Sequence, residues 1–319
     1  MNRKTIVESV PSWPETLFNA LTVDVEDYYM VSAFSNVVKF EDWHRYESRV
    51  EKSTSTILDL LEHYDVRATF FVLGWIAQRH PALVRDIHAA GHEIACHGYN
   101  HRLVYALTPD EFREDIRKSK GILEGITGAA VRGYRAASYS VVQKSLWALD
   151  ILIEEGFDFD SSIFPIHHDR YGIPTASRFP HVIRRAGGEI VEFPPSTYQL
   201  MGQNIPVAGG GYLRLFPWPV TKAIIERINE KEKQAVMVYV HPWEVDVEQP
   251  RLKGSWKSEL RHRINLDTTL TKLRGLLTEF KFKPLSTLLD SSGLTIRQEP
   301  DGEMQRAGEK GERSCLSRG

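Results

Sequence analysis

The sequence predicts an α/β fold in which parallel strands alternate with helices, and three observations support this. Short apolar runs alternate with amphipathic stretches from Phe18 almost to Leu289, the pattern of a parallel sheet with crossover helices. The length of 319 residues is close to that of one α/β barrel with insertions. The composition, 42% hydrophobic and 26% charged, is that of an ordinary globular protein. One large folded unit is therefore expected.

Eight apolar runs are candidate strands, which is a barrel-like number. They are Ala20–Val23, Ala68–Leu73, Glu93–Cys96, Val131–Tyr134, Phe157–Phe159, Ile190–Phe193, Val236–Val240 and Lys283–Leu285. Two stretches between them, Tyr28–Ser53 and Phe164–Glu189, lack a regular apolar rhythm. Long irregular segments in a compact domain are more often functional loops than not.

Helices are expected between the strands, and the clearest of them begins at Thr108. Pro109 follows directly and Glu111 comes three residues after the threonine, which is a capping box with proline in the first turn. The other expected helices are Thr54–His63, Pro81–Ala90, Lys144–Glu155, Pro219–Glu230 and Leu266–Phe280.

Charge and cysteine content exclude several classes of protein. Forty basic and 42 acidic residues give a net charge of −2, so no field of one sign attracts nucleic acid or an anionic membrane. The two cysteines, Cys96 and Cys315, form no disulfide framework, which favours a reducing compartment. The N-terminus lacks the apolar core of a signal peptide, and no apolar run is long enough to cross a membrane. We therefore expect a cytoplasmic protein without a transmembrane segment.

Polar side chains that can bind metals or carry protons recur directly after the apolar strands. In parallel α/β folds the ligand sits at the carboxyl ends of the strands, so these side chains should converge on one mouth. They are Asp24, Glu26, Asp27, His97, His101, Arg135, Asp160 and His241.

The pair His97 and His101 has a spacing that can chelate a metal. With 12 histidines in the chain, this spacing alone does not establish a site. His88 and His92 share it, yet Gly91 between them is typical of a helix C-terminus, so we expect these two on different elements and at the surface. His97 and His101 instead follow a buried strand, which favours ligation.

The segment from Thr22 to Asp27 places three carboxylates at a strand end, where unpaired negative charge is costly to bury. A divalent cation would offset that cost, and the alternative is pairing with arginines or solvent. Two histidines and one carboxylate leave positions open for water and substrate, as in hydrolytic zinc sites. A further carboxylate and a histidine on the other side could then act as general base and general acid, roles that fit Asp24 and His241.

Arg135 is expected to orient a neighbouring carboxylate and hold it ionised through its planar guanidinium. A surface ion pair is the alternative for this residue. His241 begins the sequence His-Pro-Trp, which is also compatible with a packed structural turn.

Seven motifs occur in a fixed order: TVDVED, HGYNH, GYRAASYS, FDFDSSIFP, EFPPST, GGGYLRLFP and YVHPWE. Over about Leu21 to Leu289, this series strongly resembles the polysaccharide deacetylases of carbohydrate esterase family 4, which share the NodB homology domain. It is most similar to the exopolysaccharide-locus deacetylases associated with exosortase and PEP-CTERM systems, which carry a C-terminal extension called DUF3473. The resemblance implies a distorted (β/α) barrel of seven or eight strands.

The resemblance also implies roles for the residues at the strand ends. Asp24 matches the catalytic base, and His97 and His101 match the metal-binding histidines. Arg135 matches the arginine motif, and His241 the general acid. In the implied reaction Asp24 takes a proton from a metal-activated water and His241 protonates the departing amine, which releases acetate.

Two departures from the family pattern affect this assignment. The family has adjacent aspartates, whereas Val25 and Glu26 separate Asp24 from Asp27 here. If the strand continues, Glu26 shares a face with Asp24, and if it turns early, Asp27 reaches the metal. The arginine motif carries Ala137 where the family has proline, which predicts a looser loop.

These observations predict three parts of the chain: an N-terminal extension (1–17), the deacetylase barrel (18–289, with a DUF3473-like part from about 164) and a disordered tail (290–319). The expected cofactor is a divalent metal, with zinc favoured. The expected substrate is an N-acetylated polysaccharide or its precursor in exopolysaccharide biosynthesis. The alternatives are a glycan-binding pseudoenzyme and a small-amide hydrolase. Aromatic residues near the expected mouth would suit a glycan groove, or pack in the core: Tyr28, Tyr29, Tyr134, Tyr139, Tyr212 and Trp243.

Overall fold

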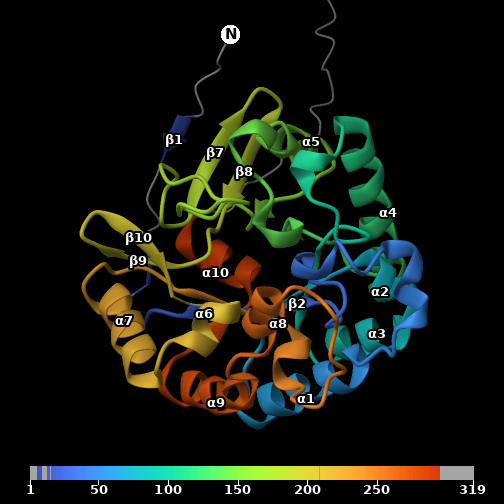
Figure 1. The fold of residues 1–319 in the computed structure, drawn as a ribbon. Helices are drawn as coiled ribbons and strands as arrows, with labels where there is room; N and C mark the ends of the chain where they lie inside the picture. The colour runs from blue at the N-terminus through green and yellow to red at the C-terminus, as the bar shows by residue number, and fades with distance from the viewer. Residues whose placement is uncertain (1–5, 9–12, 15, 208, 295–319) are drawn as a thin grey trace, which may run out of the picture.

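The computed structural model describes residues 6–8, 13–14, 16–207 and 209–294, and its centre is a parallel sheet (Figure 1). The parallel strands lie in the order β11, β2, β3, β4, β5, β6 and β8, and β12 also pairs with β2. Their bounds are β2 Asn19–Val25, β3 Thr69–Val72, β4 Glu93–Cys96, β5 Gly133–Tyr134, β6 Phe159–Asp160, β8 Gly188–Glu192, β11 Met237–Val240 and β12 Phe282–Lys283. Each of the eight expected strands overlaps an observed strand, two of them (Phe157–Phe159 and Lys283–Leu285) by one residue only, and the distorted α/β barrel is confirmed.

The central strands are apolar because both of their faces are covered. Every residue of β2, β3 and β11 is buried, as expected for parallel strands packed between layers. The polar residues of β2 are Asn19, Thr22 and Asp24, and the last two are two apart and so share one face of the strand. This face holds part of the site described below.

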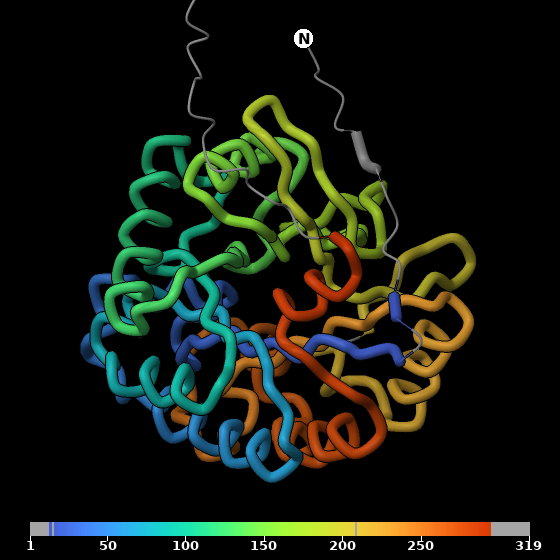
Figure 2. Tube along the Cα trace, turned by 180° about the vertical axis from the view of Figure 1, so that it is seen from behind, coloured from blue at the N-terminus to red at the C-terminus, as the bar shows by residue number. Residues whose placement is uncertain are grey.

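Helices surround the strands, as Figures 1 and 2 show. They are α1 Val50–His63, α2 Gly74–Arg79, α3 Pro81–Ala89, α4 Pro109–Thr127, α5 Ala148–Glu154, α6 Gly210–Leu215, α7 Trp218–Glu230, α8 Trp256–Arg263, α9 Thr269–Glu279 and α10 Leu285–Ser292. The capping box at the start of α4 is confirmed, because Glu111 N donates to Thr108 Oγ1 at 3.2 Å and Thr108 N donates to Glu111 Oε2 at 2.8 Å. Among the described residues, no helix is both long and apolar enough to cross a membrane.

The structure differs from the sequence-based expectation at the edges of the sheet. Within the stretch expected to be irregular, β7 (His181–Arg185) forms an antiparallel hairpin with β8, and β1 (Ile6–Glu8) from the N-terminal extension pairs with β7. A second hairpin joins β9 (Thr197–Leu200) and β10 (Gln203–Pro206). Strands β7, β9 and β10 are short and only partly buried, so they lack the continuous apolar run that marks a buried strand.

Two expected loop boundaries also shift. Helix α1 begins at Val50, inside the expected loop 28–53, and α10 continues to Ser292, so residues 290–292 are helical and not part of a tail. The remaining tail that was expected to be disordered, residues 295–319 with Cys315, lies outside the described residues.

Candidate active site

Three side chains at the ends of β2 and β4 form a group that could hold a metal ion. One ligand atom each from Glu26, His97 and His101 lies within 4.8 Å of the other two. Glu26 Oε2 is 3.1 Å from His101 Nε2, and both side chains are almost fully buried. The left-handed backbone of His101, with φ of 57°, turns its ring back toward His97 after the end of β4. The expected histidine pair and one expected carboxylate are therefore brought together.

The chemistry of this group fits a divalent cation. His97 Nδ1 lies 2.8 Å from the carbonyl oxygen of Arg135, which can only accept, so this nitrogen carries the proton and Nε2 is free to bind a metal. Burial lowers the pKa of His97, and lowers that of His101 to about 4, which keeps both rings neutral. Glu26 Oε2 is buried and makes no hydrogen bond. A buried carboxylate oxygen next to two neutral imidazoles is a suitable donor set for zinc.

Asp27 lies outside this group, although the sequence left it as a candidate ligand. Its Oδ2 accepts hydrogen bonds from Ser48 Oγ at 2.8 Å, Arg49 N at 2.9 Å and Val50 N at 3.2 Å. Its Oδ1 accepts from Tyr28 N at 3.1 Å. The carboxylate therefore supports the start of α1. The reason is that β2 continues to Val25. Because the strand does not turn early, Glu26 lies on the same side as Asp24, and Asp27 points to the other side.

Asp24 lies beside the metal-binding group and is held by Arg135. Arg135 Nη1 donates to Asp24 Oδ1 at 2.5 Å and to Thr22 Oγ1 at 2.9 Å, and its other nitrogens donate to the Ser161 hydroxyl and carbonyl. The guanidinium is fully buried and packs over the ring of Phe71, 4.0 Å from its centroid. Burial raises the pKa of Asp24, but Arg135 and the nearby histidines outweigh it and bring the pKa below its usual value. Asp24 is therefore ionised, and the surface-ion-pair alternative for Arg135 is wrong.

His241 lies directly after β11, next to both Asp24 and Glu26. Its Nε2 is 3.9 Å from Asp24 Oδ2 and 3.6 Å from Glu26 Oε1. Its Nδ1 is 2.5 Å from Glu244 Oε1. Burial lowers the pKa of His241, but the hydrogen bond to Glu244 and the surrounding carboxylates outweigh it and raise the pKa to about 9. His241 thus faces the site through Nε2 and is anchored through Nδ1.

Three further residues complete the site: the sequence placed Trp243 among the aromatic residues near the mouth, and it assigned no role to Glu244 or Arg214. Glu244 holds His241, and Arg214 Nε donates to Glu244 Oε2 at 2.7 Å in a fully buried ion pair. Trp243 Nε1 donates to Glu26 Oε1 at 3.2 Å, and its ring stacks on the imidazole of His241. The run HPWE could have indicated Glu244, because residues i and i+3 meet in a helical turn. Arg214 is 30 positions from Glu244, and no local pattern links them.

The second histidine pair behaves as a control for the first. Gly91 has φ of 81° and follows α3, so His88 and His92 lie on different elements, as expected. His92 is not at the surface, however: its side chain is 4% exposed, accepts from Ala68 N at 3.2 Å and packs against Phe70. The same spacing therefore produces a metal-binding arrangement only where a turn brings both rings to one side.

Asp160, expected at the same mouth, instead forms a buried carboxyl pair with Glu192 of the neighbouring strand. The two residues are register partners of β6 and β8, and both are fully buried. Ser162 Oγ donates to Asp160, and Ile163 N donates to Glu192 Oε1 at 3.0 Å. Burial raises the pKa of Asp160 to about 6, and burial together with Asp160 raises that of Glu192 well above its usual value. The pair therefore keeps a proton where free carboxyl groups have lost theirs.

This pair predicts a pH dependence of stability. Between about pH 4 and 6 the folded protein binds more protons at Asp160 and Glu192 than the unfolded chain, so stability falls as pH rises. Asp160→Asn removes one of the two acids and should reduce the difference in unfolding free energy between pH 4.5 and 7.5 by about 2 kcal/mol. Urea denaturation at both pH values measures this. Asp59→Asn, an exposed carboxylate on α1, is the matched control, and an equal change in both variants would contradict the prediction.

Two family models match separate parts of the chain. Residues 35–150 match the family model described as polysaccharide deacetylase, and residues 161–290 match the domain of unknown function DUF3473. The chain is 36% identical over 98 residues to a peptidoglycan-N-acetylglucosamine deacetylase of Bacillus cereus. The aligned region covers 30% of this chain and 36% of that protein. The chain is 31% identical over 114 residues to a chitooligosaccharide deacetylase of Rhizobium leguminosarum bv. trifolii, 36% of this chain and 49% of that protein. The matches thus span about a third to a half of these relatives.

Solved structures share the fold over nearly the whole chain. A protein assigned as a polysaccharide deacetylase in Mycobacterium smegmatis aligns with a TM-score of 0.61 and 21% identity, covering 92% of this chain and 98% of that one. PuuE allantoinase aligns with a TM-score of 0.54 and 17% identity, covering 85% and 88% of the two chains. At these identities the alignments establish the fold.

The two matched segments contribute different parts of the site. His97, His101 and Arg135 lie in the first segment, whereas His241 and its support from Glu244 lie in the second. The segment that matches DUF3473 supplies β8, β11 and β12 of the same sheet. Residues 35–150 thus resemble polysaccharide deacetylases, and residues 161–290 resemble DUF3473.

Proposed function

We propose that this protein is a divalent-metal-dependent hydrolase that removes N-acetyl groups from a polysaccharide or its precursor. One observation carries the proposal: the group of Glu26, His97 and His101 lies next to an ionised carboxylate, Asp24, and a histidine, His241, whose Nε2 is 3.9 Å from Asp24 Oδ2 and 3.6 Å from Glu26 Oε1. This is the arrangement that metal-assisted amide hydrolysis requires, with a base for the attacking water and an acid for the leaving amine.

Each residue has a role that its contacts support. A zinc ion held by Glu26, His97 and His101 would lower the pKa of a water molecule and polarise the acetamide carbonyl. Asp24, kept ionised by Arg135, accepts the proton of that water. His241 donates a proton from Nε2 to the departing nitrogen.

Two neighbouring side chains would keep His241 in place during this reaction. Glu244 binds Nδ1 of His241, which fixes the ring with Nε2 toward the carboxylates. Arg214 is buried against Glu244 and so keeps that carboxylate charged. A buried acid without this cation would tend to take up a proton and lose its hold on the imidazole.

The substrate class rests on the relatives. The matched curated proteins are described as deacetylases of peptidoglycan N-acetylglucosamine and of chitooligosaccharides, and both are chains of N-acetylated sugars. The motif series described above favours an exopolysaccharide or its precursor within this class. Peptidoglycan fragments and chitin oligosaccharides are therefore the first substrates to test.

The decisive measurement is acetate release from chitin tetrasaccharide and from peptidoglycan fragments by zinc-loaded protein. We expect turnover that is lost after chelation and restored by added zinc. Zinc and glycan binding without acetate release from any glycan would identify a pseudoenzyme. Hydrolysis of a small amide such as allantoin, with no glycan turned over, would identify a small-amide hydrolase on the same fold.

A further inference from the structure

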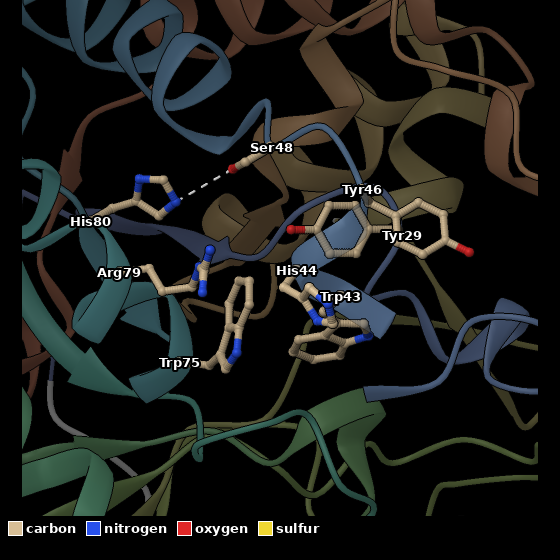
Figure 3. A pocket seen from close by; sticks show the side chains of 8 residues that line it. All are labelled: Tyr29, Trp43, His44, Tyr46, Ser48, Trp75, Arg79 and His80. Atoms are coloured by element: carbon tan, nitrogen blue, oxygen red, sulfur yellow. Dashed lines mark hydrogen bonds between the residues drawn. The ribbon is translucent and has the colours of Figure 1, made fainter. Parts of the chain in front are cut away.

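A pocket of about 370 Å³ is lined in part by Tyr29, three residues after Glu26 in the chain, and no role has been given to it so far (Figure 3). It is formed by the 3-10 helix η2 (Phe40–Arg45), the segment that follows it, helix α2 and the residue before α3. Its lining residues are Tyr29, Trp43, His44, Tyr46, Ser48, Trp75, Arg79 and His80. The volume lies within the range of small-ligand sites, roughly 300–1,000 Å³.

The walls of the pocket are aromatic and fixed by packing. The rings of Trp43 and Trp75 meet edge to face with centroids 5.3 Å apart, and Tyr29 stacks on Tyr46 at 5.1 Å. Trp43, Trp75 and Tyr29 are at most 9% exposed, so their rings are held by the core and not by the ligand. Rigid aromatic walls suit the apolar C–H faces of a sugar ring.

Two polar groups in the pocket are not satisfied by the protein. Arg79 is exposed, lies with its guanidinium carbon 4.8 Å from the centroid of the Trp75 ring, and makes no ion pair with any residue that the structure describes. The Tyr29 hydroxyl is buried and makes no hydrogen bond that meets normal geometry. Ser48, which interacts with it more weakly, donates its own proton to Asp27. A ligand with several acceptor oxygens would satisfy both groups.

The pocket is linked to the metal-binding group by two short connections. Tyr29 comes three residues after Glu26, so their Cα atoms are at most about 11 Å apart. On the other side, Trp75 N donates to the carbonyl of Tyr99, which lies midway between His97 and His101. Tyr29 on one wall and Trp75 on the other are thus each connected to a segment that carries a candidate metal ligand.

We propose that this pocket is an outer subsite that binds a second sugar of the glycan whose acetylated residue lies at the Glu26 group. The sugar's C–H face packs on the Trp43 and Trp75 rings, and its oxygens accept hydrogen bonds from Arg79 and the Tyr29 hydroxyl. This inference rests on the proposed function. It also explains a preference for longer glycans, because a glycan that fills both the pocket and the site at the Glu26 group binds more tightly than one that fills the latter alone.

The first test compares substrates of two lengths. Arg79→Ala removes a donor to the second sugar, and it should lower the ratio of kcat/KM for chitin tetrasaccharide to that for N-acetylglucosamine, which has no second sugar, on the order of tenfold, the value of one charged hydrogen bond. Arg85→Ala, an exposed arginine on α3 outside the pocket, should leave the ratio unchanged. An unchanged ratio in Arg79→Ala would overturn the subsite.

A binding experiment separates this inference from the proposed function. Chitin tetrasaccharide is titrated into zinc-loaded wild type, Arg79→Ala and Trp75→Phe, with tryptophan fluorescence as the signal. We expect Kd to rise on the order of tenfold in Arg79→Ala, and Trp75→Phe, which keeps an aromatic wall, to show a smaller rise. If wild type binds the glycan but releases no acetate, the proposed function fails while the pocket stands. Equal Kd values in wild type and Arg79→Ala would refute the pocket even if acetate is released.

Discussion

Asp24→Asn is expected to lower kcat for acetate release by about 10²–10⁴, the usual contribution of a positioned general base. The amide cannot accept the proton of the attacking water, although it still fits beside Arg135 and Thr22. Zinc content should stay at the wild-type level, because Asp24 is not among the three side chains of the ligand group. Acetate assays and metal analysis on the same preparation measure both effects.

The exposed control Asp59→Asn should leave both kcat and zinc content unchanged. Replacement of Asp24 also leaves the buried Arg135 without a charged partner, so thermal unfolding must be recorded for each variant. A folded Asp24→Asn protein with full activity would refute the assignment of Asp24 as the base.

Glu26→Gln is expected to weaken metal binding, whereas Asp27→Asn is expected to leave it nearly unchanged. Glu26→Gln removes the anionic member of the ligand group and should weaken zinc binding by at least about 100-fold, since loss of residues that only support ligands already costs 10–100-fold. Asp27→Asn should leave zinc affinity within about twofold, because the side chain bonds to Ser48 and to the start of α1. Competition with a chromophoric chelator gives both affinities.

Asp27→Asn should instead lower the melting temperature, with a loss of about 1 kcal/mol that is typical of a weakened helix start. Both substitutions exchange a carboxylate for an amide of the same shape, so each serves as a control for the other. Weak zinc binding in Asp27→Asn together with normal binding in Glu26→Gln would reverse the assignment made from the geometry.

Much of the fold could be predicted from the sequence because the buried parallel strands are nearly continuous apolar runs. Val236–Val240 and Ala68–Leu73, for example, correspond to β11 and β3 with shifts of one residue at their ends. The β7 strand could not be predicted in the same way. Its buried side chains alternate with more exposed ones, so its sequence contains no continuous apolar run. Pairing with β8 decides its conformation.

The candidate residues at the strand ends could be named because their positions follow from chain order alone. Whether Glu26 or Asp27 joins the histidines depended on where β2 ends, and the difference of one residue reverses the side to which a side chain points. The Ala137 loop, expected to be looser than in the family, forms a compact 3-10 turn in which Ala137 is buried. In both cases the neighbouring segments, and not the local sequence, set the conformation.

By itself the sequence determined the order of strands and helices and the set of polar residues that converge at one mouth, because both follow from patterns that are local in the chain. Only the tertiary structure decided that Glu26 completes the group with His97 and His101. It alone showed that Arg214 holds Glu244 against His241 from a distant part of the chain. The physical reason is that burying such charges is tolerable only where each one meets its partner, and those partners come from segments that folding alone brings together.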